Sequence, residues 1–299
     1  MQIFSGSSNR ELASKIAKLL ESQMGKVESS KFENGERRVR VMGEAKGSVA
    51  LIQSLSSPVD EHLIEFCLLG DALTRQGHTN MVGIVPWLGY SKQDKVFLPG
   101  EPLSAKVIAQ ILQTTKIKKI ITFDLHNRAI TGFFDIPVVE LSAKPLFLEY
   151  FRKMVGADTV VVAPDEGAVK ASAYFARELN IPIAYMDKRR DLKTGKVEVV
   201  SMSGEVKGKR VIIVDDMIVT GSTMMESAKY LKKQGAKSVS VAATHHLHIP
   251  GVQEKLEKSE IDEVVVTDSV SKIINNQVPI INKKLKILSI AQMIVDELQ

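Results

Sequence analysis

Short runs of β-branched and other apolar residues recur along the chain and are separated by polar stretches. Each run has the length and composition of a strand that is buried on both faces of a sheet. The clearest runs are VALIQ (49–53), MVGIV (81–85), KIITF (119–123), TVVVA (159–163), RVIIVD (210–215) and SVSVAAT (238–244). Strands that are apolar on both faces predict a parallel sheet covered by helices.

Segments with helical spacing of apolar residues lie between these runs, at 60–75, 104–114, 167–179 and 222–234. Because strands and helices alternate, the pattern predicts an α/β fold. The pattern also occurs twice, since one strand ends in an acid and a short polar loop near Asp124 and another near Asp215. The residues themselves are not repeated, so we expect two domains that share only their architecture.

Composition narrows the class of protein. Of 299 residues, 44% are hydrophobic and 25% are charged, which is ordinary for a globular chain of two medium domains. The single cysteine, Cys67, excludes an intrachain disulfide framework and favours a reducing, cytoplasmic location. We expect neither secretion nor a membrane partner, because the sequence shows no signal-like start and no long apolar run. The net charge of +5 is spread over several short basic clusters, and anionic small molecules explain it as well as nucleic acid does. We expect no nucleic-acid partner.

The stretch VIIVDDMIVTGST (211–223) carries the strongest chemical signal. Ligands of parallel sheets bind beyond the carboxyl ends of the strands, where we expect Asp215 and Asp216 to lie. The following Thr-Gly-Ser-Thr offers backbone amides and hydroxyls before a helix, an arrangement that favours phosphate. Two carboxylates beside it suit the vicinal hydroxyls of a ribose, directly or through Mg²⁺, so the implied ligand is a sugar phosphate. The alternative is that the aspartates cap a turn and Ser222 caps the helix.

This stretch resembles the phosphoribosyl diphosphate-binding signature shared by type I phosphoribosyltransferases and ribose-phosphate diphosphokinases. Further stretches are similar to the diphosphokinases specifically: FENGERRV (32–39), YSKQDKVFLPGEPLSAK (90–106), TFDLHNRAITGFF (122–134), APDEGAVK (163–170) and MDKRR (186–190). The resemblance spans nearly the whole chain. It implies two phosphoribosyltransferase-like domains, each with a central, mainly parallel sheet flanked by helices, at 1–143 and 144–283. We expect 284–299, which reads as a strand and then an amphipathic helix, to pack back on the first domain.

The resemblance implies transfer of the β,γ-diphosphoryl group of ATP to the 1-hydroxyl of ribose 5-phosphate, with Mg²⁺ as cofactor. The chemistry needs charge neutralisation more than covalent help, and MDKRR supplies cations. Lys188 and Arg190 match the family's catalytic Lys and Arg, on a loop expected to close over the diphosphoryl group. From the residues alone, a Lys-Arg-Arg run is equally typical of a solvated surface.

The resemblance also assigns ligand-binding residues. The ribose 5-phosphate site would comprise Asp215, Asp216, Val219, Thr220, Gly221, Ser222 and Thr223. The metal site would comprise His126 and Asp165, although a histidine at a strand end is often only a hydrogen-bonding loop residue. The ATP site would comprise Phe32, Asn34, Gly35, Glu36, Lys92, Gln93, Asp94 and His126. The resemblance implies that a neighbouring subunit completes this ATP site, and hence a homo-oligomer. From the residues alone, FENGE is only an Asn-Gly turn between strands.

Three histidines in THHLH (244–248) raise the question of a metal site. They are His245, His246 and His248, and neither a carboxylate nor a cysteine accompanies them in the sequence. They follow a predicted strand and occupy the family's Ala-Thr-His loop. We therefore favour a hydrogen-bonded loop over a metal site.

The chain departs from the family pattern at a few positions. Lys92 stands where the family usually has Arg, Val219 where it usually has an acid, and Lys170 where Arg is common. Glu166 and Ala168 stand in a stretch that is commonly richer in glycine. These departures leave three hypotheses open: an active diphosphokinase, a non-catalytic regulatory paralogue, and a nucleobase phosphoribosyltransferase, which would have no ATP site.

Overall fold

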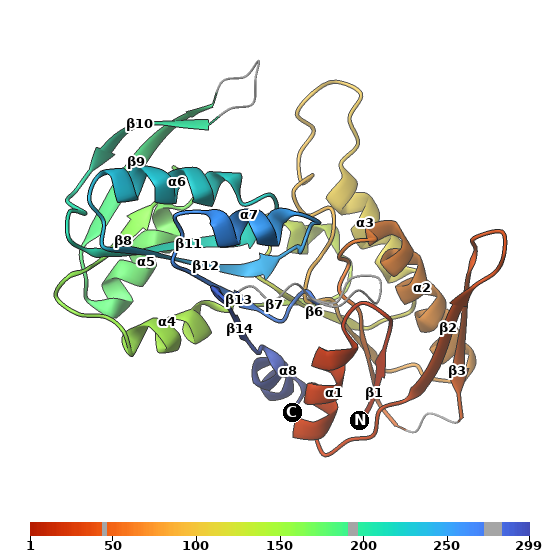
Figure 1. Cartoon of the computed structure of the whole chain (residues 1–299). Coiled ribbons are helices and arrows are strands. Elements are labelled where there is room, and N and C mark those ends of the chain that lie inside the picture. The colour runs from red at the N-terminus through yellow and green to blue at the C-terminus, as the bar shows by residue number, and fades with distance from the viewer. Residues whose placement is uncertain (44–46, 191–196, 272–282) are drawn as a thin grey trace. The chain divides into compact units, whose positions relative to one another are not determined.

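The computed structural model describes residues 1–43, 47–190, 197–271 and 283–299 (Figure 1). These residues divide into two compact units. Unit 1 comprises Met1–Ser142, 268–271 and Ser289–Gln299, and unit 2 comprises Ala143–Thr267 and 283–288. In the part of the chain that the structure describes, no helix is long and apolar enough to span a bilayer.

Unit 1 is built on a five-stranded parallel sheet. The strands, in spatial order, are β1 (Gln2–Ser5), β4 (Val49–Ile52), β5 (Met81–Ile84), β6 (Lys119–Phe123) and β7 (Val138–Leu141). Its helices are α1 (Arg10–Leu19), α2 (Val59–Arg75), α3 (Ser104–Gln113), the 3-10 helix η1 (Arg128–Phe133) and α8 (Ala291–Leu298). Every residue of β4 is buried, as its unbroken apolar run predicts. A separate two-stranded hairpin, β2 (Lys26–Lys31) and β3 (Arg37–Met42), carries the predicted Asn-Gly turn.

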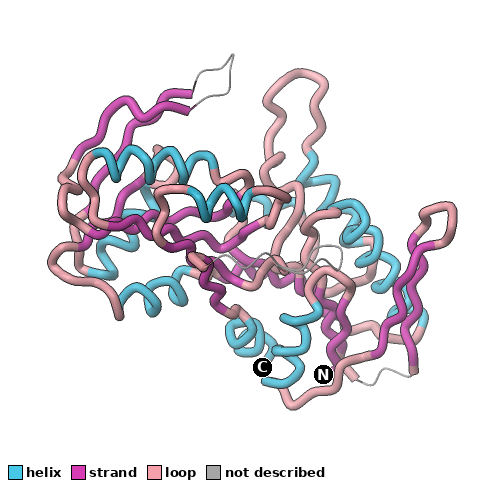
Figure 2. Tube along the Cα trace, viewed as in Figure 1, coloured by secondary structure: helices cyan, strands magenta, loops and turns pink. Residues whose placement is uncertain are grey.

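Unit 2 is built on a seven-stranded sheet (Figure 2). The strands, in spatial order, are β10 (Val197–Ser203), β9 (Ile183–Arg190), β8 (Thr159–Ala163), β11 (Arg210–Ile218), β12 (Ser238–His246), β13 (Glu263–Thr267) and β14 (Leu285–Leu288). The pair β9 and β10 is antiparallel and the other pairs are parallel. Its helices are α4 (Lys144–Arg152), α5 (Val169–Leu179), α6 (Ser222–Lys233) and α7 (Val252–Lys258). The α/β fold with helix-flanked parallel sheets is therefore confirmed.

The central strand β11 shows why this sheet is buried on both faces. Val211 and Ile213 belong to one core cluster, which also contains Met224 of α6 and Leu256 of α7. The alternate residue Ile212 belongs to a second cluster, with side chains of α4 and α5. Successive side chains of a strand point to opposite faces, so two helices cover each side of the sheet.

The C-terminal segment divides between the units. Strand β14 pairs with β13 and is the edge strand of unit 2, whereas we expected the whole of 284–299 to pack on the first domain. Helix α8 lies in unit 1, where it packs against α1. The main chain of 285–288 finds its hydrogen-bonding partners on β13, and the buried Ile294 and Val295 of α8 join the apolar interior of unit 1.

Candidate functional site

The two aspartates of the phosphate-loop motif lie within a strand and not at its end. Strand β11 pairs with β12 as far as Ile218, but with β8 only as far as Ile213. The sequence predicted that this strand would end at Asp215, and it continues because β12 still supplies partners for its main chain. Asp215 and Asp216 therefore lie beyond the carboxyl end of β8 with one strand neighbour instead of two.

Asp215 and Asp216 are two adjacent carboxylates whose negative charges repel each other. Burial, the adjacent Asp216 carboxylate and the charge of Asp165 together raise the pKa of Asp215 to about 7. Its Oδ1 accepts a hydrogen bond of 2.8 Å from the backbone N–H of Asp216, and the two side chains share a hydrogen bond. Near neutral pH the two carboxylates compete for one proton, so hydroxyl donors or a cation would be favourable partners here.

The loop Val219–Gly221 joins β11 to α6. Gly221 has φ +71° and is the residue before the helix, which makes no side-chain cap hydrogen bond at this end. The hydroxyls of Thr220 and Ser222 are 3.0 Å apart, and both residues are exposed. Ser222 is already helical, so the alternative in which it caps the helix is wrong. The loop presents hydroxyls and the first-turn amides of α6, including that of Thr223, in the arrangement that favours phosphate.

Asp165 lies two residues beyond the end of β8 and is half-buried. Its Oδ1 accepts a 3.1 Å hydrogen bond from the N–H of Ala168, which shapes the turn into α5. A Cβ on Gly167 would lie 3.4 Å from the same oxygen. The side chain of Glu166 is exposed. Asp165 acts electrostatically on Asp215, so these acids line one end of the sheet of unit 2.

Lys188 and Arg190 lie on the antiparallel ribbon of β9 and β10. The sequence predicted a strand that ends near Met186 and a loop beyond it, but β9 continues to Arg190. Lys188 is opposite Val199 and Arg190 is opposite Val197 in the backbone register. Residues 191–196 of the predicted closing loop lie outside the described residues.

In unit 1, the tip of the β2–β3 hairpin carries the first group of candidate ATP residues. Asn34 Oδ1 accepts a 3.1 Å hydrogen bond from Glu36 N–H, and Gly35 has φ +89°. Phe32 is 51% exposed, and the guanidinium of Arg38 lies 5.9 Å from its ring centroid. This turn holds an aromatic face in solvent, where a base could stack.

The second group of candidate ATP residues lies on the loop that precedes α3. Gln93 Oε1 accepts a 2.7 Å hydrogen bond from Ser104 Oγ, and Lys92 is exposed. Asp94 Oδ2 accepts a 2.6 Å bond from Asn127 Nδ2, which brings this loop beside the segment of His126. Lys31 of the hairpin contacts Glu61, and the hydroxyl of Tyr90 donates to Asp60, so both segments contact the start of α2.

His126 is an exposed residue of the loop after β6. The preceding Asp124 has φ +30° and accepts a 2.7 Å hydrogen bond from Ser142 Oγ, and Leu125 N–H donates to Glu140 Oε1 at 3.0 Å. His126 belongs to unit 1 and Asp165 to unit 2. Among the described residues, no group of three or more His, Cys, Asp or Glu side chains is spaced to hold a metal ion. Oxygen ligands such as Asp165 suit Mg²⁺, which usually completes its shell with water and substrate phosphates.

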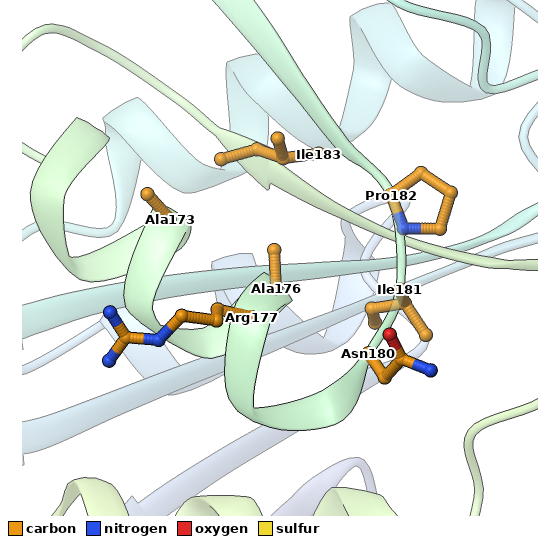
Figure 3. Close-up of a pocket in the computed structure, with 7 residues that line it drawn as sticks. All are labelled: Ala173, Ala176, Arg177, Asn180, Ile181, Pro182 and Ile183. Carbon is orange, nitrogen blue, oxygen red and sulfur yellow. The ribbon is translucent and has the colours of Figure 1, made fainter.

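A surface depression of about 520 Å³ lies elsewhere on unit 2 (Figure 3). Its lining runs from Ala173 in the middle of α5 to Ile183, the first residue of β9. Because β9 and β11 both run parallel to β8, this depression is at the amino ends of the strands. The candidate site is at their carboxyl ends, so the depression is no part of it.

The chain matches known protein families along most of its length. Residues 1–115 match the family model of the N-terminal domain of ribose phosphate pyrophosphokinase, and 131–281 match the phosphoribosyl transferase domain. Ribose-phosphate pyrophosphokinases from Fusobacterium nucleatum and Thermotoga maritima are 39% and 38% identical, over 97% and 98% of this chain and 91% and 92% of their own lengths. A crystal structure of phosphoribosylpyrophosphate synthetase from Mycobacterium smegmatis aligns with a TM-score of 0.87 at 33% identity, covering 99% of this chain and 96% of that one. The chain therefore belongs to the ribose-phosphate pyrophosphokinase family.

Proposed function

We propose that the protein transfers the β,γ-diphosphoryl group of ATP to the 1-hydroxyl of ribose 5-phosphate. The hydroxyl oxygen forms a bond to the β-phosphorus, the bond from that phosphorus to the α,β-bridging oxygen breaks, and AMP leaves. The products are 5-phosphoribosyl 1-diphosphate and AMP, with the hydroxyl proton released. Family membership supports the reaction, and the phosphate loop beside two carboxylates is the observation that carries it.

Ribose 5-phosphate binds at the carboxyl end of β11 in this proposal. The loop Val219–Gly221 and the first residues of α6, Ser222 and Thr223, receive the 5-phosphate through amides and hydroxyls. Asp215 and Asp216 accept hydrogen bonds from the ribose hydroxyls, which replaces their mutual repulsion by favourable contacts. Val219 supplies only its backbone, because its side chain is apolar.

Mg²⁺ is the cofactor in this proposal, and Asp165 and His126 are the candidate residues that would hold it. When bound, the ion neutralises charge on the triphosphate and orients its β-phosphorus. Lys188 and Arg190 add positive charge from β9 as the leaving group departs. Diphosphoryl transfer depends mainly on positioning and on charge neutralisation. Lys188 and Arg190 would therefore contribute to catalysis through their positive charge.

ATP binds between subunits of a homo-oligomer in this proposal. The hairpin tip with Phe32, Asn34, Gly35 and Glu36 approaches the loop with Lys92, Gln93 and Asp94 of another copy. The lone cysteine supports a reducing, cytoplasmic setting.

The proposal is tested by measuring AMP and 5-phosphoribosyl 1-diphosphate from ATP, Mg²⁺ and ribose 5-phosphate. We expect turnover by the wild type and a loss of about 1,000-fold or more in kcat for Lys188→Ala, as for other charge-neutralising groups of phosphoryl transfer. Lys229→Ala, an exposed lysine of α6, is the matched control and should retain wild-type turnover.

Two outcomes would favour the alternatives. A wild type that binds ribose 5-phosphate but gives no turnover would indicate the regulatory paralogue. Release of diphosphate from 5-phosphoribosyl 1-diphosphate and a nucleobase, with no use of ATP, would indicate a nucleobase phosphoribosyltransferase.

A further inference from the structure

The end of strand β12 lies directly beside the phosphate loop. His246, the last residue of β12, is opposite Ile218, the last residue of β11, in the register of the two strands. The N–H of Leu247 donates a 3.0 Å hydrogen bond to the carbonyl of Ile218. Ile218 is followed by Val219, the first residue of the phosphate loop. Any group that fixes the position of the end of β12 therefore also fixes the start of this loop.

Two histidines at this position form a stacked pair. The rings of His246 and His248 have centroids 4.3 Å apart and an interplanar angle of 25°. The N–H of His248 donates a 2.8 Å hydrogen bond to Nδ1 of His246, and His246 is completely buried. His248 has φ +50°, in the left-handed region that histidine adopts more often than most residues with a side chain. The predicted hydrogen bonding of these histidines is therefore observed for this pair.

The pair acts through geometry and not through titration. An imidazole nitrogen that accepts a backbone N–H carries no proton, so His246 is neutral. Burial and the neighbouring ring of His248 lower the pKa of His246 to about 3. The hydrogen bond between the two residues is thus present throughout the pH range in which the enzyme would work.

Helix α7 joins this pair to the phosphate loop from a second direction. The side-chain amide nitrogen of Gln253 lies 3.2 Å from Nε2 of His246 and 3.0 Å from Nδ1 of His248. Leu256 is three residues further along α7 and so lies on the same face of the helix. A Cβ on Gly221 would lie only 3.2 Å from Cδ2 of Leu256, which is fully buried. Gln253 therefore fixes to β12 the same helix that supports Gly221.

We propose that His246, His248 and Gln253 are positioning residues that hold the backbone of the phosphate loop in the geometry needed for the 5-phosphate of ribose 5-phosphate. They do not touch the substrate in this proposal, and they act through Ile218, Val219 and Gly221. The inference rests on the proposed function, in which this loop binds the phosphate. These residues belong to unit 2 and the candidate ATP-binding residues to unit 1, so we expect their loss to affect the binding of ribose 5-phosphate and not that of ATP.

Gln253→Ala is the first test, because Gln253 is only half-buried and its loss should be tolerated by the fold. Removing hydrogen bonds of ordinary strength corresponds to about a 3- to 10-fold increase in the KM and Kd for ribose 5-phosphate. We expect kcat and the KM for ATP to stay within about twofold. Gln253→Met, which keeps the length of the side chain but cannot donate a hydrogen bond, should behave like Gln253→Ala. The matched control is Glu254→Ala, its exposed neighbour on α7, which should leave both constants unchanged.

Thr220→Val separates failure of this inference from failure of the proposed site. If Thr220→Val weakens ribose 5-phosphate binding while Gln253→Ala and Gln253→Met do not, the loop binds the phosphate without help from the cluster, and the inference is wrong. If none of these variants changes the Kd, measured by calorimetry, the proposed phosphate site itself is wrong. If Gln253→Ala lowers kcat and raises both KM values together, its role is structural and the inference is again wrong.

Discussion

Glu65 of unit 1 and Asp215 of unit 2 are both carboxylates held in the interior next to a loop between a strand and a helix, yet their environments differ. Glu65 lies on α2 and is fully buried. It accepts hydrogen bonds from Ser7 N–H, Ser7 Oγ, Ser29 Oγ and Gln53 Nε2. Burial alone would raise the pKa of Glu65, but these hydrogen bonds outweigh it and the pKa is lowered. Burial and neighbouring acids instead raise the pKa of Asp215 to about 7, and among the described residues Asp216 supplies its hydrogen bonds.

The loops beside the two carboxylates differ in the same way. In the loop after β1, the amide of Ser7 donates to Glu65 and the amide of Ser8 donates to Gln53 at 3.0 Å. A Cβ on Gly6 would lie 2.3 Å from Oε1 of Gln53, so a side chain already fills the space over this loop. In unit 2, Thr220 and Ser222 are exposed. Buried side chains accept the donors of the first loop, whereas in the second loop Ser222 N–H donates to the exposed hydroxyl of Thr220. We expect buried acceptors in a structural loop and exposed hydroxyls in a binding loop.

The largest expected effect on this comparison comes from Asp215→Asn. The variant should lose about 100-fold in kcat/KM for ribose 5-phosphate, because a carboxylate that accepts from hydroxyls contributes about 1.5–3 kcal/mol. Steady-state assays with ribose 5-phosphate varied at saturating ATP would measure the loss. An unchanged kcat/KM would show that Asp215 is as structural as Glu65.

Glu65→Gln should produce the opposite result. An amide in this position places N–H groups against donors that now face a carboxylate, so we expect the free energy of unfolding to fall by about 2–4 kcal/mol. The KM for ribose 5-phosphate should stay within twofold, since Glu65 is in unit 1. Urea unfolding would measure the stability change. The matched control is Glu61→Gln on the same helix: Glu61 pairs with Lys31 and Arg37, but its side chain is 39% exposed, so the loss should be below about 1 kcal/mol. Equal losses in the two variants would contradict the role assigned to Glu65.

The comparison of these two carboxylates also separates the features that the sequence could predict from those that it could not. Unbroken apolar runs predicted the central strands, and Thr-Gly-Ser-Thr after a strand with two acids predicted the phosphate loop. These signals are local, because they depend only on residues that are neighbours in the sequence. The resemblance of motifs along the chain predicted the family.

The remainder depends on partners that are distant in sequence. The role of Glu65 requires Ser7, Ser29 and Gln53 to converge on it, which no spacing reveals. The extension of β11 to Ile218 depends on β12, and the division of 284–299 depends on β13 offering a free edge to β14. The pairing of His246 with His248 could have been suspected from their spacing, but the contact with Gln253 comes from the packing of α7.

The pH dependence of stability should differ in sign between the two carboxylates. The pKa of Asp215 is raised from an ordinary 3.8 to about 7, so the folded state binds its proton more tightly than the unfolded state does. The resulting stability is complete below about pH 4, is lost as the pH rises to about 7, and is absent above that. We therefore expect Asp215→Asn to be more stable than the wild type at pH 8, by on the order of 1–3 kcal/mol, and this advantage to shrink towards pH 5.

For Glu65, whose pKa is lowered, the stabilisation is present above its ordinary value of 4.5 and is lost only as the pH falls through the lower folded value. The deficit of Glu65→Gln should accordingly be constant from pH 8 to pH 5 and decrease in more acidic solution. Urea unfolding of both variants and the wild type at several pH values would measure these trends. Parallel pH profiles for the two variants would contradict the contrast.

The smallest expected effect is the release of protons when ribose 5-phosphate binds. It measures most directly the difference in protonation between Asp215 and Glu65. At pH 7 about half of the unliganded molecules hold a proton on the Asp215 pair, since its pKa is about 7. Hydroxyls that donate to the carboxylates favour the ionised form, so binding should release a fraction of a proton, up to about 0.5 per site. Calorimetry in buffers of different ionisation enthalpy would measure it as a slope of the binding enthalpy. Glu65→Gln should keep this slope because Glu65 is already ionised, and Asp215→Asn should remove it wherever residual binding can be measured. A slope of zero in the wild type would mean that the raised pKa of Asp215 persists in the complex, and that the ligand does not supply the hydrogen-bond donors that the chain itself supplies to Glu65.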